Sequence, residues 1–282
     1  MKIIEAKAEI IRPDLSNPDS IDAIYRLIEE AGRTCYKSKD KEVERLEKEI
    51  ETVAKTDMLS KEEKKAEIYR LEGLLLEAKN KSARRFVSIL VKSGHEAMIE
   101  HANMCVRFTV DRGVSHELVR HRLASWAQES SRYCNYSKDK FGDEITVIDP
   151  IFYKDIPAER KLEIQNMFTK EFKHPGNLVD TLSDLEKRYA DWFYSCYVAE
   201  ASYLEMLHYG AEPQEARDIL PTSTKTEVVM TMNMRELRHF FKLRAVGTTG
   251  KPHPQMVEVA LPLLKKCQEV MPELFGDIEI PG

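Results

Sequence analysis

The sequence predicts a mixed α/β protein in which helices dominate, with a helical hairpin inserted at about residues 38–80. Two observations support this fold class. Four short runs have the pattern of strands, whereas most other segments place apolar residues at helical spacing. Residues 38–80 differ from the rest because they are dense in Lys and Glu. Of the 282 residues, 42% are apolar, so we expect one domain, spanning 1–282, with a substantial core.

The first expected elements are a strand and a helix. Residues 2–12 are rich in isoleucine and stop at Pro13, which cannot donate to a sheet ladder. Asp19 and Ser20 are candidate caps for the following helix, and Gly32 is placed to end it. The apolar residues of this helix recur with its period: Ile21, Ile24, Tyr25 and Ile28.

Residues 38–80 predict two helices that pack against each other as a hairpin. Ser60 and Glu63 lie between them with the spacing of a capping box, which favours a hairpin over one long rod. We expect an arm that projects from the domain, and we assign it no chemistry. Its apolar seams follow heptad spacing: Val43, Leu46, Ile50 and Val53, then Ile68, Leu71, Leu75 and Ala78.

A strand leads into the most distinctive segment of the chain. Residues 103–110 alternate, Gly113 breaks the strand, and Ser115 starts a helix that runs toward Arg120. The remaining expected elements are strands at 143–150 and 226–232, a mainly helical stretch up to Tyr209, and helices at 235–245 and 255–271. Within the helical stretch, one apolar stripe consists of Leu182, Leu185, Tyr189 and Trp192.

Charge and cysteine content exclude several classes of protein. The net charge of −5 gives no general attraction to nucleic acid, so a local cluster of cations must hold any anionic ligand. No apolar run has the length of a signal peptide or a membrane span, which indicates the cytosol. The five cysteines are odd in number and lack metal-ligand spacing, so we expect reduced thiols and no metal site.

The densest cluster of chemically active residues lies at 120–133. Its three arginines, Arg120, Arg122 and Arg132, offer planar donor forks that suit phosphate oxygens or the carbonyl edge of a heterocycle. On an ideal helix Arg120 and Arg122 would point about 200° apart and could not reach one atom unless the helix ends there. The plain alternative is a surface helix whose arginines pair with Glu117 and Glu129. Apolar and aromatic residues among the charges favour a pocket wall instead: Leu123, Trp126 and Tyr133.

This segment resembles the signature of the flavin-dependent thymidylate synthases. The matching residues are Arg120, His121 and Arg122, then Ser130 after seven residues, then Arg132 and Tyr133. Three other segments resemble parts of the same family: residues 95–101 (HEAMIEH) its His-Glu segment, Arg217 in EARDILP its nucleotide-binding arginine, and residues 233–244 (NMRELRHFFKLR) its C-terminal element. In order and spacing, the resemblance covers nearly all of the chain outside residues 38–80.

The resemblance implies two overlapping sets of ligand contacts. The dUMP contacts would be Glu117, Arg120, Gln128, Glu129, Ser130, Ser131, Arg132, Arg217 and Arg244. The FAD contacts would be His95, Arg120, His121, Arg122, Gln128, Asn233, Arg235 and His239. We interpret Ser130 as a ligand-binding hydroxyl, because no His and acid relay that would activate a nucleophile is evident in the sequence.

The reaction implied by the resemblance is the reductive methylation of dUMP to dTMP. Methylenetetrahydrofolate would supply the carbon, and FAD reduced by NADPH would supply the hydride. Arg244 would be the catalytic residue, a fixed cation that stabilises anionic charge on the uracil ring without a cysteine nucleophile. The resemblance further implies a twisted sheet with packed helices and a homotetramer with active sites at subunit interfaces. We expect neither nucleic acid nor a membrane as a partner.

Three sites depart from the family pattern and loosen individual flavin contacts. Ala97 and Met98 replace a hydroxyl residue and a proline, Ala127 and Gln128 replace Asn-Glu, and Cys35 stands where Ser is more typical. Two other functions stay open: a nucleotide- or RNA-binding module that uses the arginine cluster, and a flavin- and folate-dependent enzyme that modifies uracil in RNA. A binding module would purify colourless, whereas the enzyme should carry yellow FAD.

Overall fold

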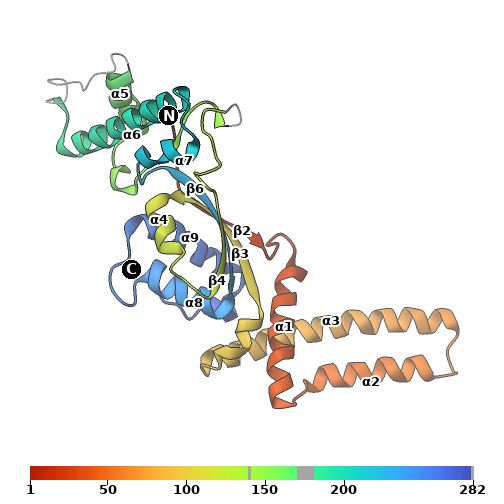
Figure 1. The fold of residues 1–282 in the computed structure, drawn as a ribbon. Helices are drawn as coiled ribbons and strands as arrows, with labels where there is room; N and C mark the ends of the chain where they lie inside the picture. Colours follow the sequence, from red (N-terminus) through yellow and green to blue (C-terminus); the bar gives the residue numbers. More distant parts are fainter. Residues whose placement is uncertain (139–140, 170–180, 281–282) are drawn as a thin grey trace. The chain divides into compact units, whose positions relative to one another are not determined.

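The computed structural model describes residues 1–138, 141–169 and 181–280 (Figure 1). It confirms a helix-rich α/β fold with two small sheets and packed helices. The chain divides into two compact units, each assembled from three segments. The first unit comprises Met1–Glu9, Arg107–Met230 and Gly247–Pro262, and the second comprises Ile10–Val106, Thr231–Val246 and Leu263–Gly282.

The larger sheet of the described residues has four strands in the order β2–β3–β6–β4. Their bounds are Lys7–Arg12 for β2, Asn103–Asp111 for β3, Lys225–Asn233 for β6 and Ala124–Gln128 for β4. Strands β3 and β6 confirm the strands predicted at 103–110 and 226–232. Every second side chain of β6 is buried, from Thr226 to Met232, as expected where one face of a strand lies against a core.

The smaller sheet pairs β1 (Lys2–Ile4) with β5 (Thr146–Ile148) in parallel, and Ile3 lies opposite Val147. The single strand expected at 2–12 is therefore wrong in one respect: it is two strands, because β1 pairs with β5 while β2 pairs with β3. The strand expected at 143–150 shortens to the three residues that pair with β1.

Helix α1 (Pro18–Tyr36) begins and ends differently from the expectation. Asn17, rather than Asp19 or Ser20, caps it, because its side-chain oxygen accepts a hydrogen bond from the Asp19 N–H at 3.0 Å. Gly32 does not end the helix. It is buried, and a side chain there would collide with the ring of Phe86, so this glycine allows close packing within the second unit.

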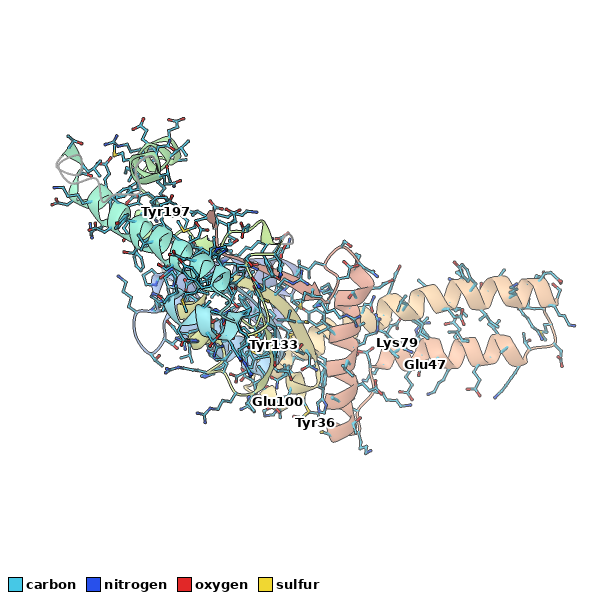
Figure 2. The ribbon with its side chains drawn as sticks, turned by 45° about the horizontal axis from the view of Figure 1, so that its top comes forward. Tyr36, Glu47, Lys79, Glu100, Tyr133 and Tyr197 are labelled. Atoms are coloured by element: carbon cyan, nitrogen blue, oxygen red, sulfur yellow. The ribbon has the colours of Figure 1, made fainter. Side chains whose placement is uncertain are left out.

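The helical hairpin is confirmed as α2 (Lys41–Lys55) and α3 (Lys61–Lys92), which lie side by side in Figure 1. Ser60 and Glu63 form the predicted capping box, with reciprocal hydrogen bonds of 2.8 and 3.3 Å. Leu46 and Leu71 are almost fully buried. Glu47 and Lys79, labelled in Figure 2, form an ion pair of 3.3 Å across the hairpin. The second helix does not stop near residue 80 but continues to Lys92.

In the first unit, α5 (Ala158–Thr169) and α6 (Asp184–His208) pack through an aromatic core around Phe168, Tyr189 and Phe193. Leu182 and Tyr189 of the predicted stripe are buried, while Leu185 and Trp192 are half-buried against the same core. Residues 170–180 of the expected helical stretch lie outside the described residues. The shorter elements are α4 (Arg112–Leu118), η3 (Ile151–Tyr153), α7 (Pro213–Ala216) and η5 (Arg217–Ile219).

The C-terminal helices broadly confirm the expected ones at 235–245 and 255–271. Helix α8 (Met234–Phe241) continues into a π-helical turn, η6 (Lys242–Val246), and α9 spans Pro254–Val270. The remaining short elements are η1 (Glu96–His101) and α10 (Pro272–Phe275). No helix within the described ranges combines the length and apolar character that crossing a membrane requires.

Candidate active site

The predicted site residues fall into both compact units. The first unit holds Glu117, Arg120, His121, Arg122, Gln128, Glu129, Ser130, Ser131, Arg132 and Arg217. The second unit holds His95, Asn233, Arg235, His239 and Arg244.

Helix α4 ends before the arginine cluster. It begins at Arg112, where Asp111 accepts a hydrogen bond from the Val114 N–H at 2.8 Å, and its last residue is Leu118. The expected helix before Arg120 is therefore present, but it begins at Arg112 rather than Ser115 and ends at Leu118. Because the helix ends first, Arg120 and Arg122 are not held on opposite sides of it, and both are exposed in the loop before β4.

His121 lies between these two exposed arginines but is buried, with 6% of its surface exposed. Its backbone carbonyl accepts a hydrogen bond from the Trp126 indole N–H at 3.1 Å. Trp126 belongs to β4, a strand that the sequence does not predict because ASWAQ does not alternate strictly between apolar and polar residues. The strand fixes the end of the loop, so the loop's course depends on the sheet rather than on a helix.

The two glutamates that a surface helix would pair with these arginines have other partners. Glu117 lies 3.1 Å from His253 Nδ1, and Glu129 lies 2.9 Å from Lys225 Nζ. Within the described part of the chain, Arg120, Arg122 and Arg132 form no ion pair with any carboxylate. Three exposed and uncompensated guanidinium groups on one segment suit an anionic ligand better than a solvated helix face.

The residues after β4 turn sharply. The Ser130 carbonyl accepts hydrogen bonds from the backbone N–H groups of Tyr133 and Cys134, at 3.1 and 3.0 Å. Ser130 Oγ accepts one from the Arg132 N–H at 3.3 Å, and Ser131 is buried. The Arg132 guanidinium lies 5.4 Å from the ring of Tyr133, which is 77% exposed and labelled in Figure 2. Gln128, just before the turn, is tied to the scaffold because its amide donates to Ser115 and Thr226.

In the second unit, His95 precedes η1 and is exposed. Its Nδ1 lies 2.7 Å from the hydroxyl of Tyr36, at the end of α1, and the two rings stack. Asn233 caps α8, because its side-chain oxygen accepts a hydrogen bond from the Glu236 N–H at 2.8 Å. The cap leaves the amide nitrogen of Asn233 as the group available for a ligand.

The other second-unit residues lie on α8 and η6. Arg235 is exposed and pairs with Glu100 at 2.6 Å, and His239 is exposed on the same helix. Arg244 is half-buried in the π-helical turn η6. Single π-helical turns inside helices occur often at functional sites, which agrees with the role expected for Arg244. Arg217, in the first unit, is half-buried in η5, directly after α7.

Comparison with known proteins identifies the family of the chain. Residues 19–273 match the model of the thymidylate synthase complementing protein family. The chain belongs to this family. Flavin-dependent thymidylate synthases are among its relatives: the Corynebacterium glutamicum protein is 28% identical over 95% of this chain and 84% of its own length. The Mycobacteroides abscessus protein is 27% identical over 98% of this chain and 88% of its own length.

A solved structure shares the fold of this family member. The UMP/dUMP methylase PolB from Streptomyces cacaoi, bound with 5-Br dUMP, superposes with a TM-score of 0.59 at 19% identity. The superposition covers 98% of this chain and 96% of the methylase. Family membership confirms the expectation from the arginine motif, and the chain is an enzyme of the methyltransferase class.

Several residues beside the expected site of this thymidylate synthase family member were not found from the sequence. Tyr36 contacts His95, while Lys225 and Tyr136 contact Glu129. Each contact joins residues at least seven positions apart, and the Lys225 contact spans 96 positions. No local pattern marks such partners, because only the folded chain brings them together.

Proposed function

We propose that this enzyme is a flavin-dependent thymidylate synthase that converts dUMP to dTMP. Methylenetetrahydrofolate is the carbon donor, and FAD, reduced by NADPH, supplies the hydride when it is bound. The observation that carries the proposal is the segment from Arg120 to Arg132. It combines buried His121 and Ser131 with three exposed guanidinium groups that have no carboxylate partner among the residues the structure describes. This donor set fits a nucleotide phosphate and a dinucleotide cofactor.

We divide the site residues by ligand as the resemblance implies. For dUMP we retain Glu117, Arg120, Gln128, Glu129, Ser130, Ser131, Arg132, Arg217 and Arg244. For FAD we retain His95, Arg120, His121, Arg122, Gln128, Asn233, Arg235 and His239. Exposed Arg120 and Arg122 can bind the negative charge of a pyrophosphate. The Ser130 and Ser131 hydroxyls and the Arg132 guanidinium, all in the turn after β4, suit a phosphate monoester.

Arg244 is the residue that we assign to activation of the substrate. It is half-buried, so its charge is less screened by water than that of an exposed arginine. A guanidinium held beside the uracil carbonyl edge stabilises the anionic charge that develops as the ring is reduced. This step uses no cysteine thiolate. Two of the thiols, Cys196 and Cys267, are unsuited to supply one, because burial raises their pKa values to about 12.

We propose that the enzyme is a cytoplasmic homotetramer with active sites at subunit interfaces and with no nucleic-acid partner. The support is an exposed apolar surface beside the cationic segment. Leu123 is 69% exposed and Tyr133 77% exposed, although both flank residues of the expected site. Large apolar side chains next to a binding site are typical of surfaces that a ligand or a second subunit covers.

The test is tritium release from dUMP tritiated at C5, with FAD, NADPH and methylenetetrahydrofolate present. We expect the purified protein to be yellow and to release tritium, whereas Arg244→Ala should lose at least about 100-fold in rate, the usual effect of removing a group that stabilises developing charge. Arg45→Ala, an exposed arginine of the hairpin, is the matched control and should behave as the parent. A colourless protein that releases no tritium would contradict the proposal.

A further inference from the structure

The carboxylate of Glu129 is enclosed by partners from the same unit. Its Oε2 lies 2.9 Å from Lys225 Nζ and accepts a hydrogen bond of 3.3 Å from the Glu227 N–H. Its Oε1 accepts a hydrogen bond of 3.4 Å from the hydroxyl of Tyr136. The side chain of Glu129 is only 13% exposed, and that of Lys225 is 19% exposed. Both carboxylate oxygens are therefore engaged inside the protein.

The backbone of Glu129 is fixed at the same place. Its N–H donates to the Glu227 carbonyl at 2.8 Å, which continues the contact between β4 and β6 by one residue. Its carbonyl accepts a hydrogen bond of 3.3 Å from the Arg112 guanidinium, at the start of α4. The positive charge of Arg112 also acts on the Tyr136 hydroxyl and offsets part of the rise in its pKa. The contacts thus join α4, β6 and the turn after β4 in one network.

The charges in this network depend on one another. Burial alone would lower the pKa of Lys225, but the Glu129 and Glu227 carboxylates outweigh burial and raise it, so the ammonium group is retained. Burial and the nearby Glu129 charge raise the pKa of Tyr136, so its phenol stays a hydrogen-bond donor. Removing Lys225 would leave a largely buried carboxylate without its cation, which a folded protein avoids by moving the group toward water.

We propose that Lys225 and Tyr136 are positioning residues for nucleotide binding, and this inference rests on the proposed function. They hold Glu129, and Glu129 is the residue directly before the turn that presents Ser130, Ser131 and Arg132. Lys225 and Tyr136, which we call the Glu129 clamp, hold both carboxylate oxygens, so the side chain of Glu129 orients the turn in addition to its proposed contact with dUMP. If Glu129 swings outward, the hydroxyls and the guanidinium of the turn lose their fixed placement.

Steady-state kinetics of the parent, Lys225→Met and Lys225→Arg tests the clamp. We expect Lys225→Met to raise KM for dUMP by about 10- to 100-fold, as for a binding group misplaced by an ångström, with kcat within about twofold of the parent. Lys225→Arg should return the KM for dUMP most of the way to the parental value, because a guanidinium can donate to the same carboxylate. If Lys225 only stabilised the fold, its loss would change kcat and flavin content as well as KM, and arginine at this position would not selectively recover KM.

Two further variants keep the test decisive if Lys225→Met folds poorly. Tyr136→Phe removes one hydroxyl and keeps the ring in its buried site, so it should raise KM for dUMP about 3- to 10-fold while retaining bound flavin. Lys266→Met makes the same substitution as Lys225→Met at an exposed ion pair and should leave KM unchanged. Far-ultraviolet circular dichroism and flavin content report folding.

The inference is overturned if folded Lys225→Met and Tyr136→Phe keep the parental KM, or if kcat falls while KM does not change. A parental KM in folded Tyr136→Phe, together with no rescue by Lys225→Arg, overturns it as well. Failure of the proposed function looks different, because the parent itself would then release no tritium, and the inference would fall with it. If the parent releases tritium and only the variants are defective, the result tests the role of Lys225 and Tyr136 and leaves the proposed function unchanged.

Discussion

Arg238 is the largest fully buried side chain in the described part of the chain, although it carries a charge. Its guanidinium donates to both carboxylate oxygens of Asp277 at 2.6 Å, to Glu96 at 3.1 Å and to the Leu274 carbonyl. Arg238 holds the pKa of Asp277 below its ordinary value. The residue therefore ties α8 to η1 and to the C-terminal segment of the second unit, close in sequence to Arg235 and His239.

We predict that Arg238→Leu lowers the free energy of unfolding by about 1.5–3 kcal/mol, since it removes the hydrogen bonds that the buried guanidinium donates to Glu96, Asp277 and the Leu274 carbonyl. Urea denaturation followed by circular dichroism measures this change. Arg45→Leu is the control, because Arg45 makes two ion pairs on an exposed helix face and should matter little. Equal midpoints for Arg238→Leu and the parent would show that the buried network does not stabilise the second unit.

The sequence reveals the chemical type of a residue but not its distant partners. The arginine motif could be found because three guanidinium groups, hydroxyls and aromatic residues lie within fourteen positions. Arg238 and Lys225 could not be found, because their partners lie up to 142 and 96 positions away. The same limit applies to Glu129: its residue type predicts a ligand contact, and only the fold shows that Lys225 and Tyr136 hold its carboxylate oxygens.

Elements with a long and regular apolar period were predicted well, and short ones were not. The hairpin and strands β3 and β6 show many repeats of their period, so local pattern and tertiary structure agree. Strand β4 has five residues and β5 has three, so sheet partners rather than pattern define them. Gly32 has the position of a helix end in the sequence, yet its lack of a side chain allows the close contact with Phe86.

The hairpin allows a prediction about one element. Leu71 is 1% exposed on α3, and Leu74 on the same helix is 40% exposed. We expect Leu71→Ala to destabilise the packing of α2 against α3 by about 2–5 kcal/mol, because it removes a buried side chain and leaves a cavity. Hydrogen exchange of the α2 and α3 amides measures the change. Leu74→Ala is the matched control, and equal exchange in the two variants would contradict the predicted seam.

Helix α9 carries a group whose protonation should affect stability near neutral pH. Burial, together with the charges of Asp149, Glu5 and Asp111, raises the pKa of Glu258 to about 7, and Lys154 offsets only part of this. One oxygen of Glu258 is buried without a hydrogen-bond partner in the structure. The folded protein therefore holds a proton that the unfolded chain releases near pH 4.5, and stability falls as pH rises from 4.5 through 7.

We predict that Glu258→Gln abolishes this loss, because the amide cannot ionise. The variant should be more stable than the parent at pH 8 by on the order of 2 kcal/mol, and the difference should shrink toward pH 5. Thermal unfolding of both proteins at several pH values measures the difference. A stability difference that stays constant between pH 5 and 8 would show that Glu258 does not titrate in this range.

At the scale of the whole molecule, the expected site residues are divided between two compact units. Strands β2, β3 and β6 contribute residues to both units, which supports our proposal of one domain with an inserted hairpin. Arg132 belongs to the first unit and Arg244 to the second. In the proposed homotetramer, a site that needs both arginines takes them from one chain or from two, and the two arrangements predict different behaviour of mixed assemblies.

We predict that inactive Arg132→Ala and inactive Arg244→Ala restore activity when they are coexpressed. Suppose that each site takes Arg132 from one subunit and Arg244 from another. Half of the subunits then carry each intact arginine, so after random mixing roughly a quarter of the sites contain both. The tritium-release rate should then approach a quarter of the parental rate, whereas either variant alone stays inactive. If both arginines come from one chain, no mixed site is complete, so an inactive mixture that contains both variants in one assembly would rule out shared sites.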